Sequence, residues 1–157
     1  MNNLAYLSLG SNINPEKNLP AAVKLLARYG AIKAVSSVWE TAPVGFTEQA
    51  NFLNAAVLLE TSLSAQHLWE KAICEIERGL KRVRIKNKNA PRTIDIDVVL
   101  FNRDILSFGH HKIPDADILE RAFVAIPLAE IAPEYDHPEV DQTLAEIAAQ
   151  FDPAAEK

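Results

Sequence analysis

The apolar residues of this chain recur with two periods, one typical of β-strands and the other of α-helices. Runs rich in β-branched and aromatic residues predict strands, and apolar positions three or four residues apart predict amphipathic helices. The strands predicted in this way cover residues 4–9, 31–41, 52–61 and 93–101. One helix is predicted from Pro15 to about Gly30, and a second from a cap at Ser64 to about Leu80.

The order of these elements is strand, helix, strand, strand, helix, strand. This is the ferredoxin-like βαββαβ arrangement, so we predict an α+β fold in which two helices pack on one face of an antiparallel sheet. The remainder predicts a short strand near 105–108, a loop through Pro114, a helix over 121–131 and a last helix capped by Thr143. With 157 residues, the chain fits one domain, 1–157, with these additional C-terminal helices.

Two acidic residues interrupt the last predicted sheet strand. Because side chains alternate between the faces of a strand, Asp95 and Asp97 should lie side by side on one face, about 7 Å apart at the backbone. The opposite face is then apolar and carries Ile94, Ile96, Val98 and Leu100. Neighbouring carboxylates on a covered sheet repel unless donors or a cation compensate, and a hard metal such as Mg²⁺ suits them.

A basic stretch leads directly into this acidic strand. Six of the chain's 16 basic residues lie between residues 81 and 92. Guanidinium groups for phosphate oxygens and carboxylates for the accompanying Mg²⁺ are the two halves of a phosphate site. The competing interpretation is a solvated charged loop followed by a strand with an exposed polar face.

Composition excludes several classes of protein. The formal net charge of −5 opposes a nucleic-acid binder, whose affinity would rest on an excess of Lys and Arg. No apolar run approaches the ~18 residues needed to cross a bilayer, and the N-terminus shows no basic leader. Cys74 is the only cysteine, so we expect a small buried hydrophobe in a reducing compartment. The cytoplasm is the expected location, without nucleic acid, membrane or an evident protein partner.

Several short motifs along the chain occur in a specific order and spacing. They are Leu-Gly-Ser-Asn at 9–12, Thr-Ala-Pro-Val-Gly at 41–45, Asn-Phe-Leu-Asn-Ala at 51–55 preceded by Gln49, Pro-Arg-Thr-Ile-Asp-Ile-Asp at 91–97, Arg-Ala-Phe at 121–123, Pro-Leu at 127–128 and Ile-Ala-Pro at 131–133. Together they resemble the 6-hydroxymethyl-7,8-dihydropterin pyrophosphokinases of the folate pathway over nearly the whole chain. Members of that family transfer pyrophosphate from ATP to the hydroxymethyl group of the pterin and release AMP.

The resemblance implies a role for each matching residue on the nucleotide side. Asp95 and Asp97 would hold two Mg²⁺ ions that bridge the triphosphate. The residues implied in catalysis are Arg82, Arg92, Asp95 and Asp97, and those implied in ATP binding are Glu77, Arg82, Arg84, Arg92 and Arg121. For Glu77, a solvent-facing helix residue is an equally good interpretation.

On the pterin side, the resemblance implies stacking and fixed amides for a flat, donor-rich ring. Phe52 and Phe123 would sandwich the ring, and the amide of Asn54 would read its polar edge. Thr41, Ala42 and Val44 would add side-chain and backbone contacts within or beside the long loop over 42–51. Without the family context, Phe52 could equally be a core residue.

The chain departs from the family pattern in two places. It has Lys81-Arg82 and Asn89-Ala90 where members usually show Gly-Arg and Trp-Gly. Asp115 and Ala116 replace side chains that contact phosphate, so we expect weak nucleotide binding. The neighbouring His110 and His111 are expected in a loop and should not share a metal ion, since adjacent residues of an extended segment point apart.

Two functions from different classes therefore stay open at the level of the sequence. The first is an active pyrophosphokinase, which the retained Asp95 and Asp97 favour. The second is a weakly catalytic or non-catalytic homologue that binds a pterin or nucleotide as a regulatory module, which Asp115 favours. A third, RNA binding, is opposed by the net charge. It is also opposed by the aliphatic residues and paired aspartates at the central-strand positions where an RNA-recognition module needs exposed aromatic residues.

Overall fold

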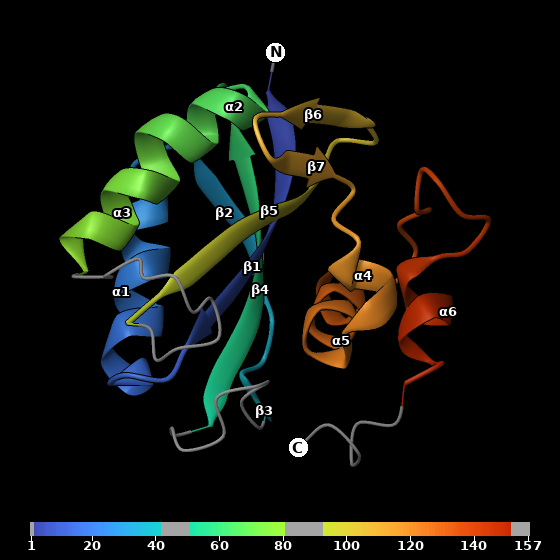
Figure 1. Cartoon of the computed structure of the whole chain (residues 1–157), viewed down its shortest axis with the longest axis horizontal. Coiled ribbons are helices and arrows are strands. Elements are labelled where there is room, and N and C mark those ends of the chain that lie inside the picture. Colours follow the sequence, from blue (N-terminus) through green and yellow to red (C-terminus); the bar gives the residue numbers. More distant parts are fainter. Residues whose placement is uncertain (1, 42–50, 81–92, 152–157) are drawn as a thin grey trace.

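The structure is a computed structural model that describes residues 2–41, 51–80 and 93–151. A central antiparallel sheet lies between two layers of helices (Figure 1). The predicted α+β class is therefore confirmed. Most of the predicted loop over 42–51 and the basic residues 81–92 lie outside the described residues.

The sheet has the strand order β2-β4-β1-β5, and β3 pairs with the free part of the outer edge of β4. The five strands are β1 (Asn3–Ser11), β2 (Ala31–Val35), β3 (Trp39–Thr41), β4 (Phe52–Thr61) and β5 (Asp95–Phe101). Each neighbouring pair is antiparallel. The central strand β1 therefore contacts both β4 and β5 along its length.

The predicted strand over 31–41 is two strands. The break lies at Ser36, which is 8% exposed and forms two hydrogen bonds to the backbone of Ala56. The Ser36 N–H donates to Ala56 O at 2.9 Å, and the Ser36 hydroxyl accepts from Ala56 N at 2.8 Å. A side chain that takes over a ladder bond in this way interrupts a strand, and the apolar pattern does not reveal it.

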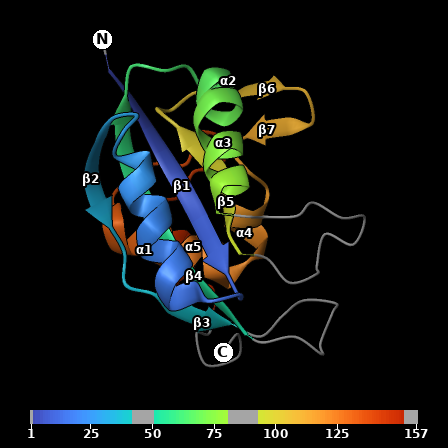
Figure 2. The same ribbon diagram turned by 90° about the vertical axis from the view of Figure 1, so that its left-hand side faces the viewer.

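One face of the sheet is covered by α1 (Pro15–Leu26) and by a long helix made of α2 (Ala65–His67), the π-helical segment η1 (Leu68–Ile73) and α3 (Cys74–Gly79) (Figure 2). Leu7 and Leu9 of β1 pack against the apolar residues of these helices in the larger core cluster. Helix α1 ends at Leu26, earlier than predicted. Gly30 does not end the helix but allows a close approach to β4, because a Cβ on residue 30 would lie 2.1 Å from the backbone oxygen of Glu60.

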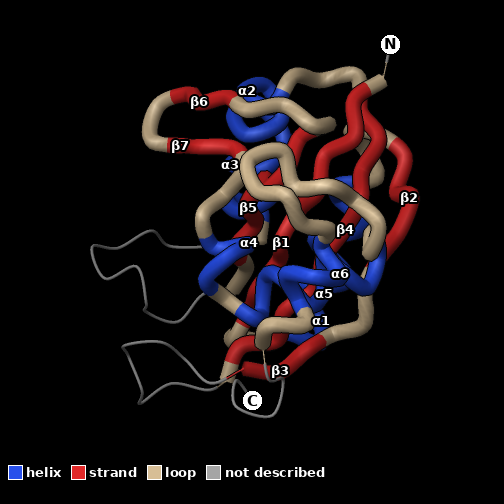
Figure 3. Tube along the Cα trace, turned by 90° about the vertical axis from the view of Figure 1, so that its right-hand side faces the viewer, coloured by secondary structure: helices blue, strands red, loops and turns tan. Residues whose placement is uncertain are grey.

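The C-terminal helices cover the opposite face of the sheet (Figure 3). They are α4 (Asp117–Glu120), α5 (Ala122–Ile131) and α6 (Leu144–Ala148). Val124 and Leu128 pack against Tyr6 and Ala56 in a second core cluster. As predicted, Thr143 caps the last helix, with its side chain and that of Glu146 forming a capping box. The short helix α4 was not predicted.

A β-bulge corrects the predicted faces of β5. Leu7 of β1 faces Val98, but the next residue of β1, Tyr6, faces Leu100, so Val99 is the extra residue. Ile96 and Val98 lie in the larger cluster, whereas Leu100 lies in the second cluster with Tyr6. The prediction that Leu100 shares a face with Ile96 is therefore wrong, because one inserted residue reverses the alternation.

A hairpin of β6 (Leu106–Phe108) and β7 (His111–Ile113) stands at one end of the sheet (Figure 1). Strand β7 occupies part of the predicted loop. Gly109 has a φ of 56°, the left-handed conformation that two-residue hairpin turns require. The hairpin contacts the long helix, since the rings of His111 and Trp69 have their centroids 4.2 Å apart.

Two further expectations concern single features of the chain. Cys74 is half-buried rather than fully buried, so its description as a core hydrophobe holds only in part. In the described part of the chain, no helix is both long enough and apolar enough to span a bilayer. The cytoplasmic location stays a prediction.

The first testable prediction concerns His137, which is 3% exposed in the segment before α6. Its Nδ1 accepts from the Glu139 N–H at 3.1 Å, and its Nε2 is buried without a hydrogen-bond partner among the described residues. Burial lowers the pKa of His137, and the nearby Glu139 opposes this only in part. As the pH falls below about 6.5, the unfolded chain takes up a proton that the folded chain resists, so stability should fall.

Thermal melts of the wild type and of His137→Gln between pH 7.5 and 5.5 measure this effect. The wild type should lose more stability than the variant over this range. His67→Gln is the matched control, because His67 is exposed on α2. Equal pH dependence of the wild type and His137→Gln would contradict the assignment.

Candidate active site

One face of the sheet carries polar residues where the C-terminal helices stop covering it. In the pairing register, Gly10 of β1 stands between Asn54 of β4 and Asp95 of β5. Two pairs further along, Ser8 faces Asp97. Strand alternation places all of these side chains on the face that carries Tyr6 and the second core cluster. The row from Asn54 to Asp95 therefore spans about 10 Å, or two strand spacings.

Because Gly10 has no side chain, it leaves space above the sheet on this face. A Cβ at Gly10 would lie 3.1 Å from Asn54 Oδ1 and 3.8 Å from Phe52 Cδ1. Phe52 and Asn54 are therefore neighbours directly above the glycine. Phe52 is half-buried and belongs to neither core cluster of the described residues, which disfavours its interpretation as a core residue.

The orientation of the Asn54 side chain is fixed by β3. Its Nδ2 donates to Thr41 Oγ1 at 2.8 Å and approaches the backbone oxygen of Trp39 at 3.4 Å. Asn54 and Thr41 are 4% and 7% exposed. Because both amide hydrogens are directed to β3, the oxygen Oδ1 faces the space above Gly10 and can accept a hydrogen bond there.

The two aspartates predicted from the sequence lie on this same face. Both are half-buried, and they flank Ile96, whose side chain is fully buried on the other face. The start of their strand is tied to the end of β1, because the Ser11 hydroxyl donates to Thr93 O at 2.6 Å. Adjacent carboxylates on a partly open face form an all-oxygen donor set, which fits a hard divalent cation.

Glu77 is the clearest correction to the expectations for single residues. It is 2% exposed on α3, so the interpretation as a solvent-facing helix residue is wrong. Its Oε2 accepts from the Ile96 N–H at 3.1 Å. Apolar spacing alone could not show this, because Glu77 follows the buried Ile76 and reaches the edge of the sheet beside it.

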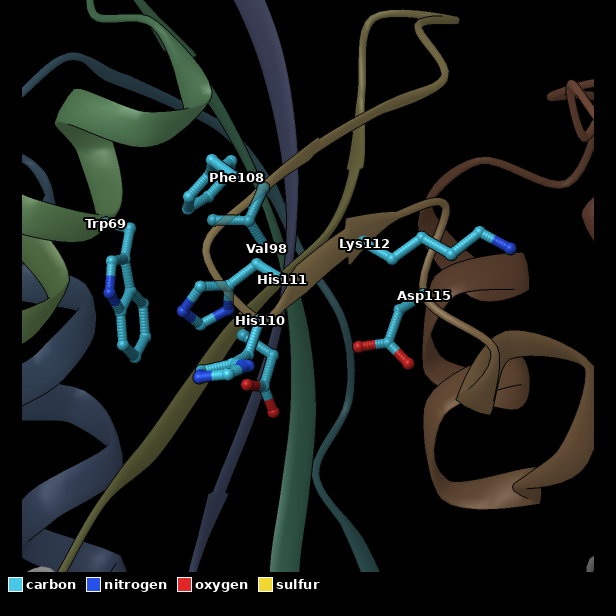
Figure 4. Close-up of a pocket in the computed structure, with 8 residues that line it drawn as sticks. Trp69, Val98, Phe108, His110, His111, Lys112 and Asp115 are labelled. Carbon is cyan, nitrogen blue, oxygen red and sulfur yellow. The ribbon is translucent and has the colours of Figure 1, made fainter.

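A pocket of about 100 Å³ adjoins Asp97 of the aspartate pair. Figure 4 shows it between the long helix, the hairpin and the segment that enters α4. Its lining residues are Trp69, Asp97, Val98, Phe108, His110, His111, Lys112 and Asp115. The ring of His111 lies between Trp69 and Phe108, with centroid distances of 4.2 and 5.0 Å. This aromatic wall suits the flat, apolar-faced ring of a ligand whose charged part lies next to it.

Asp115 has a structural role that its position in the motif did not reveal. Its backbone N–H donates to Val99 O at the bulge, 3.0 Å away, which holds Asp115 beside β5. Its Oδ1 accepts from Asp117 N at 2.9 Å at the start of α4. Burial raises the pKa of Asp115, the bond from Asp117 N opposes this, and the charges of Asp117, Asp95 and Glu120 raise it further.

Apart from Glu77, the predicted site residues divide into three groups. Thr41, Phe52, Asn54, Asp95 and Asp97 lie on one face of the sheet. Arg121 is exposed and immediately precedes α5, and Phe123 is half-buried in α5, which packs on that face. Ala42, Val44, Arg82, Arg84 and Arg92 lie outside the described residues.

Sequence reasoning missed the wall formed by Trp69, Phe108 and His111. His111 was expected in a loop, but it lies half-buried in β7, while His110 is exposed. The contact between helix and hairpin has no local signal, because about forty residues separate its partners. The one available hint was a tryptophan beside the buried Leu68. The described residues contain no group of three or more metal-ligating side chains.

The fold and this face together define a class of protein, the α+β proteins that carry paired carboxylates beside a pocket on one face of an antiparallel sheet. Comparison with known proteins makes the class specific. The family model described as 7,8-dihydro-6-hydroxymethylpterin-pyrophosphokinase (HPPK) matches residues 6–133. The chain therefore belongs to the HPPK family.

Curated relatives agree with the family model. A protein of Bacillus subtilis named 2-amino-4-hydroxy-6-hydroxymethyldihydropteridine pyrophosphokinase is 44% identical over 139 residues, covering 87% of this chain and 82% of its own length. A protein of the same name from Methylorubrum extorquens is 42% identical over 153 residues, with coverages of 96% and 94%. Among solved structures, the Plasmodium falciparum HPPK-DHPS A437G protein with SDX-DHP superposes with a TM-score of 0.79 at 17% identity. That match covers 96% of this chain and 45% of the other, and it supports the fold alone.

The second testable prediction concerns the stability role of Asp115. A raised pKa means that folding favours the neutral carboxyl, so the carboxylate destabilises the fold as the pH rises above its ordinary value of 3.8. Asp115→Asn removes the charge and keeps an acceptor for Asp117 N, so it should raise the melting temperature at pH 7 and have less effect at pH 4. Asp115→Ala lacks the acceptor and should be about 1 kcal/mol less stable than Asp115→Asn.

Thermal and urea unfolding of the three proteins at both pH values measure these differences. The asparagine and alanine variants differ only in the hydrogen-bonding group, so each serves as the control for the other. An equal difference between the wild type and Asp115→Asn at pH 4 and at pH 7 would refute the charge effect.

Proposed function

We propose that this chain transfers the terminal pyrophosphoryl group of ATP to 6-hydroxymethyl-7,8-dihydropterin, yielding the pterin diphosphate and AMP in folate biosynthesis. The single observation that carries the proposal is the pair Asp95 and Asp97 on an uncovered sheet face, within reach of a pocket on one side and Asn54 on the other. Membership of the HPPK family and the names of the relatives support it. A regulatory binding module would not require the aspartate pair.

The finer description of the fold is part of the same proposal. We infer that β1, α1, β2 with β3, β4, the long helix and β5 form the ferredoxin-like βαββαβ unit. The order β2-β4-β1-β5 supports this inference. The C-terminal helices then close the second face of one domain and leave the site at the end where β1 finishes.

The metal site proposed here consists of the carboxylates of Asp95 and Asp97. When bound, two Mg²⁺ ions would neutralise the triphosphate oxygens and align the attacking hydroxyl with the β-phosphorus. The chain's own contribution is to hold both carboxylates on one rigid strand. The bond between Ser11 and Thr93 fixes the start of that strand, and the bulge at Val99 fixes its far end to Asp115.

For the nucleotide, we propose that the base lies against the wall of Trp69 and His111, so that the phosphates extend toward Asp97. This direction follows from the pocket, which Asp97 lines together with the aromatic residues (Figure 4). Arg121 stands before α5 on the same side, and Arg82, Arg84 and Arg92 would supply further guanidinium groups. Asp115 points into the pocket, and its carboxylate would repel a triphosphate there, so it should weaken the binding of ATP.

For the pterin, we propose that the ring lies over Gly10 and between Phe52 and Phe123. The space above the glycine supports this, since any larger residue there would contact Asn54 and Phe52. The oxygen of Asn54 would accept from the donor-rich edge of the ring, while Thr41 holds the amide in that orientation. Ala42 and Val44 would contact the ring from the following loop.

The test of this function is the product formed from ATP. Purified protein incubated with ATP, Mg²⁺ and 6-hydroxymethyl-7,8-dihydropterin should yield AMP and the pterin diphosphate in equal amounts, separated by ion-exchange chromatography. Formation of ADP, or no nucleotide product that depends on the pterin, would reject the proposal.

The third testable prediction concerns the metal ligands. Asp95→Ala and Asp97→Ala should each lower the rate of AMP formation by at least about a hundredfold, because each removes one hard ligand from the site. Circular dichroism should remain that of the wild type, since both side chains are only half-buried. Glu75→Ala, which removes an exposed carboxylate from α3, is the control and should retain the rate. A wild-type rate in either aspartate variant would remove that residue from the metal site.

The fourth testable prediction separates the pterin from the nucleotide. Asn54→Ala and Phe123→Ala should weaken pterin binding by about 1 to 3 kcal/mol through loss of a buried polar contact or of stacking. Binding of a non-hydrolysable ATP analogue should change less. Titration calorimetry with each ligand measures both values. Thr41→Val, which removes only the acceptor for the Asn54 amide, should have a smaller effect on the pterin alone. Equal losses for both ligands would indicate a general folding defect.

A further inference from the structure

Glu77 is a buried acid of the long helix, beside the strand that carries the two aspartates. It lies on α3, among helix residues that pack on the face opposite to Asp95 and Asp97. At 2% exposure, a carboxylate loses most of its hydration, and such a group is retained only where strong hydrogen bonds compensate. A hydrogen-bond donor that compensates for the lost hydration should therefore lie next to the carboxylate oxygens of Glu77.

One oxygen of Glu77 lies at the outer edge of β5. Oε2 accepts from the backbone N–H of Ile96 at 3.1 Å in a buried bond. β5 is an outer strand of the sheet, paired only with β1 among the strands of the five-stranded sheet. Alternate N–H groups of an outer strand have no ladder partner and need another acceptor. The long helix, which runs beside β5 in Figure 2, supplies one at this residue.

Ile96 is also the residue between the two aspartates. Its side chain is 0% exposed and packs in the larger core cluster, which also contains Ile76 of α3. Its backbone N–H is held by Glu77. The peptide unit that separates Asp95 from Asp97 is thus fixed both by packing and by a charged acceptor, which makes a stronger bond than a neutral one.

We propose that Glu77 is a positioning residue that fixes the backbone of β5 at Ile96, and with it the separation and direction of the carboxylates of Asp95 and Asp97. This inference rests on the proposed function, in which those carboxylates hold the divalent cation. The bond to Ile96 approaches β5 from the side of α3, while the two aspartates lie on the other face of the strand. Glu77 acts on the metal through the strand.

Two variants of Glu77 separate the acceptor from the charge. Glu77→Gln keeps an oxygen that can accept from Ile96 N but removes the negative charge. Glu77→Leu has a similar volume and no acceptor. Glu75→Gln and Glu75→Leu are the matched controls, because Glu75 is exposed two residues earlier on the same helix. If Glu77→Leu does not fold, Glu77→Ala carries the same measurements, since it also lacks an acceptor.

The first measurement is the exchange rate of the Ile96 amide hydrogen by NMR, without ligands. It should rise at least about tenfold in Glu77→Leu and less than about threefold in Glu77→Gln. The second is the affinity for Mn²⁺ in the presence of a non-hydrolysable ATP analogue, measured by electron paramagnetic resonance of the free ion. It should fall about tenfold in Glu77→Leu, stay within about threefold in Glu77→Gln, and be unchanged in both Glu75 variants.

The possible results have distinct meanings. A wild-type protein that binds Mn²⁺, together with a Glu77→Leu variant of equal affinity, would overturn the positioning role and leave the proposed function intact. An equal loss of affinity in the glutamine and leucine variants would also overturn it, because charge rather than the hydrogen bond would then decide. A wild-type protein that binds no Mn²⁺ with the analogue would reject the metal site itself, and the positioning role with it.

Discussion

The pairing of β1 with a strand on each side is the constraint on which the rest of the structure depends. Because β4 and β5 both run antiparallel to β1, the start of each lies beside its end. Asn54 and Asp95 consequently face the same glycine, Gly10, from opposite sides, although they are far apart in the sequence. A one-residue shift in the register of β4 or β5 would turn Asn54 or Asp95 to the other face, and the two side chains would no longer lie on the same face.

The two layers of helices differ in how much of the sheet they cover. The layer of α1 and the long helix buries the apolar face of the sheet along β1, β4 and β5. The C-terminal layer covers only the part of the other face around Tyr6 and Ala56. A sheet face that is covered at one end and open at the other provides rigid, half-buried carboxylates that a charged ligand can still reach. Rigid strands hold such groups more accurately than loops do.

Buried polar groups reinforce this arrangement at each strand terminus. Thr41 orients Asn54, Ser11 holds Thr93, and Glu77 holds Ile96. In each case the partner lies on another element, and the bond sits next to a residue of the proposed site. Asp115 is an exception, since the bond that places it beside β5 also buries its carboxyl near other acids. Burial, and to a smaller extent those charges, raise its pKa.

The sequence by itself determined the class of fold, four of the strand positions, the aspartate pair and the family motifs, because these depend on local periodicity and on residues adjacent in the chain. It did not reveal the break at Ser36, the bulge at Val99 or the strand β7, since each depends on a hydrogen bond or turn that hydrophobic patterning does not encode. Only the tertiary structure decided that Glu77 is buried and that Trp69 meets His111. Those contacts join residues distant in sequence, and their energies depend on how helices and strands pack rather than on the neighbours of each residue in the chain.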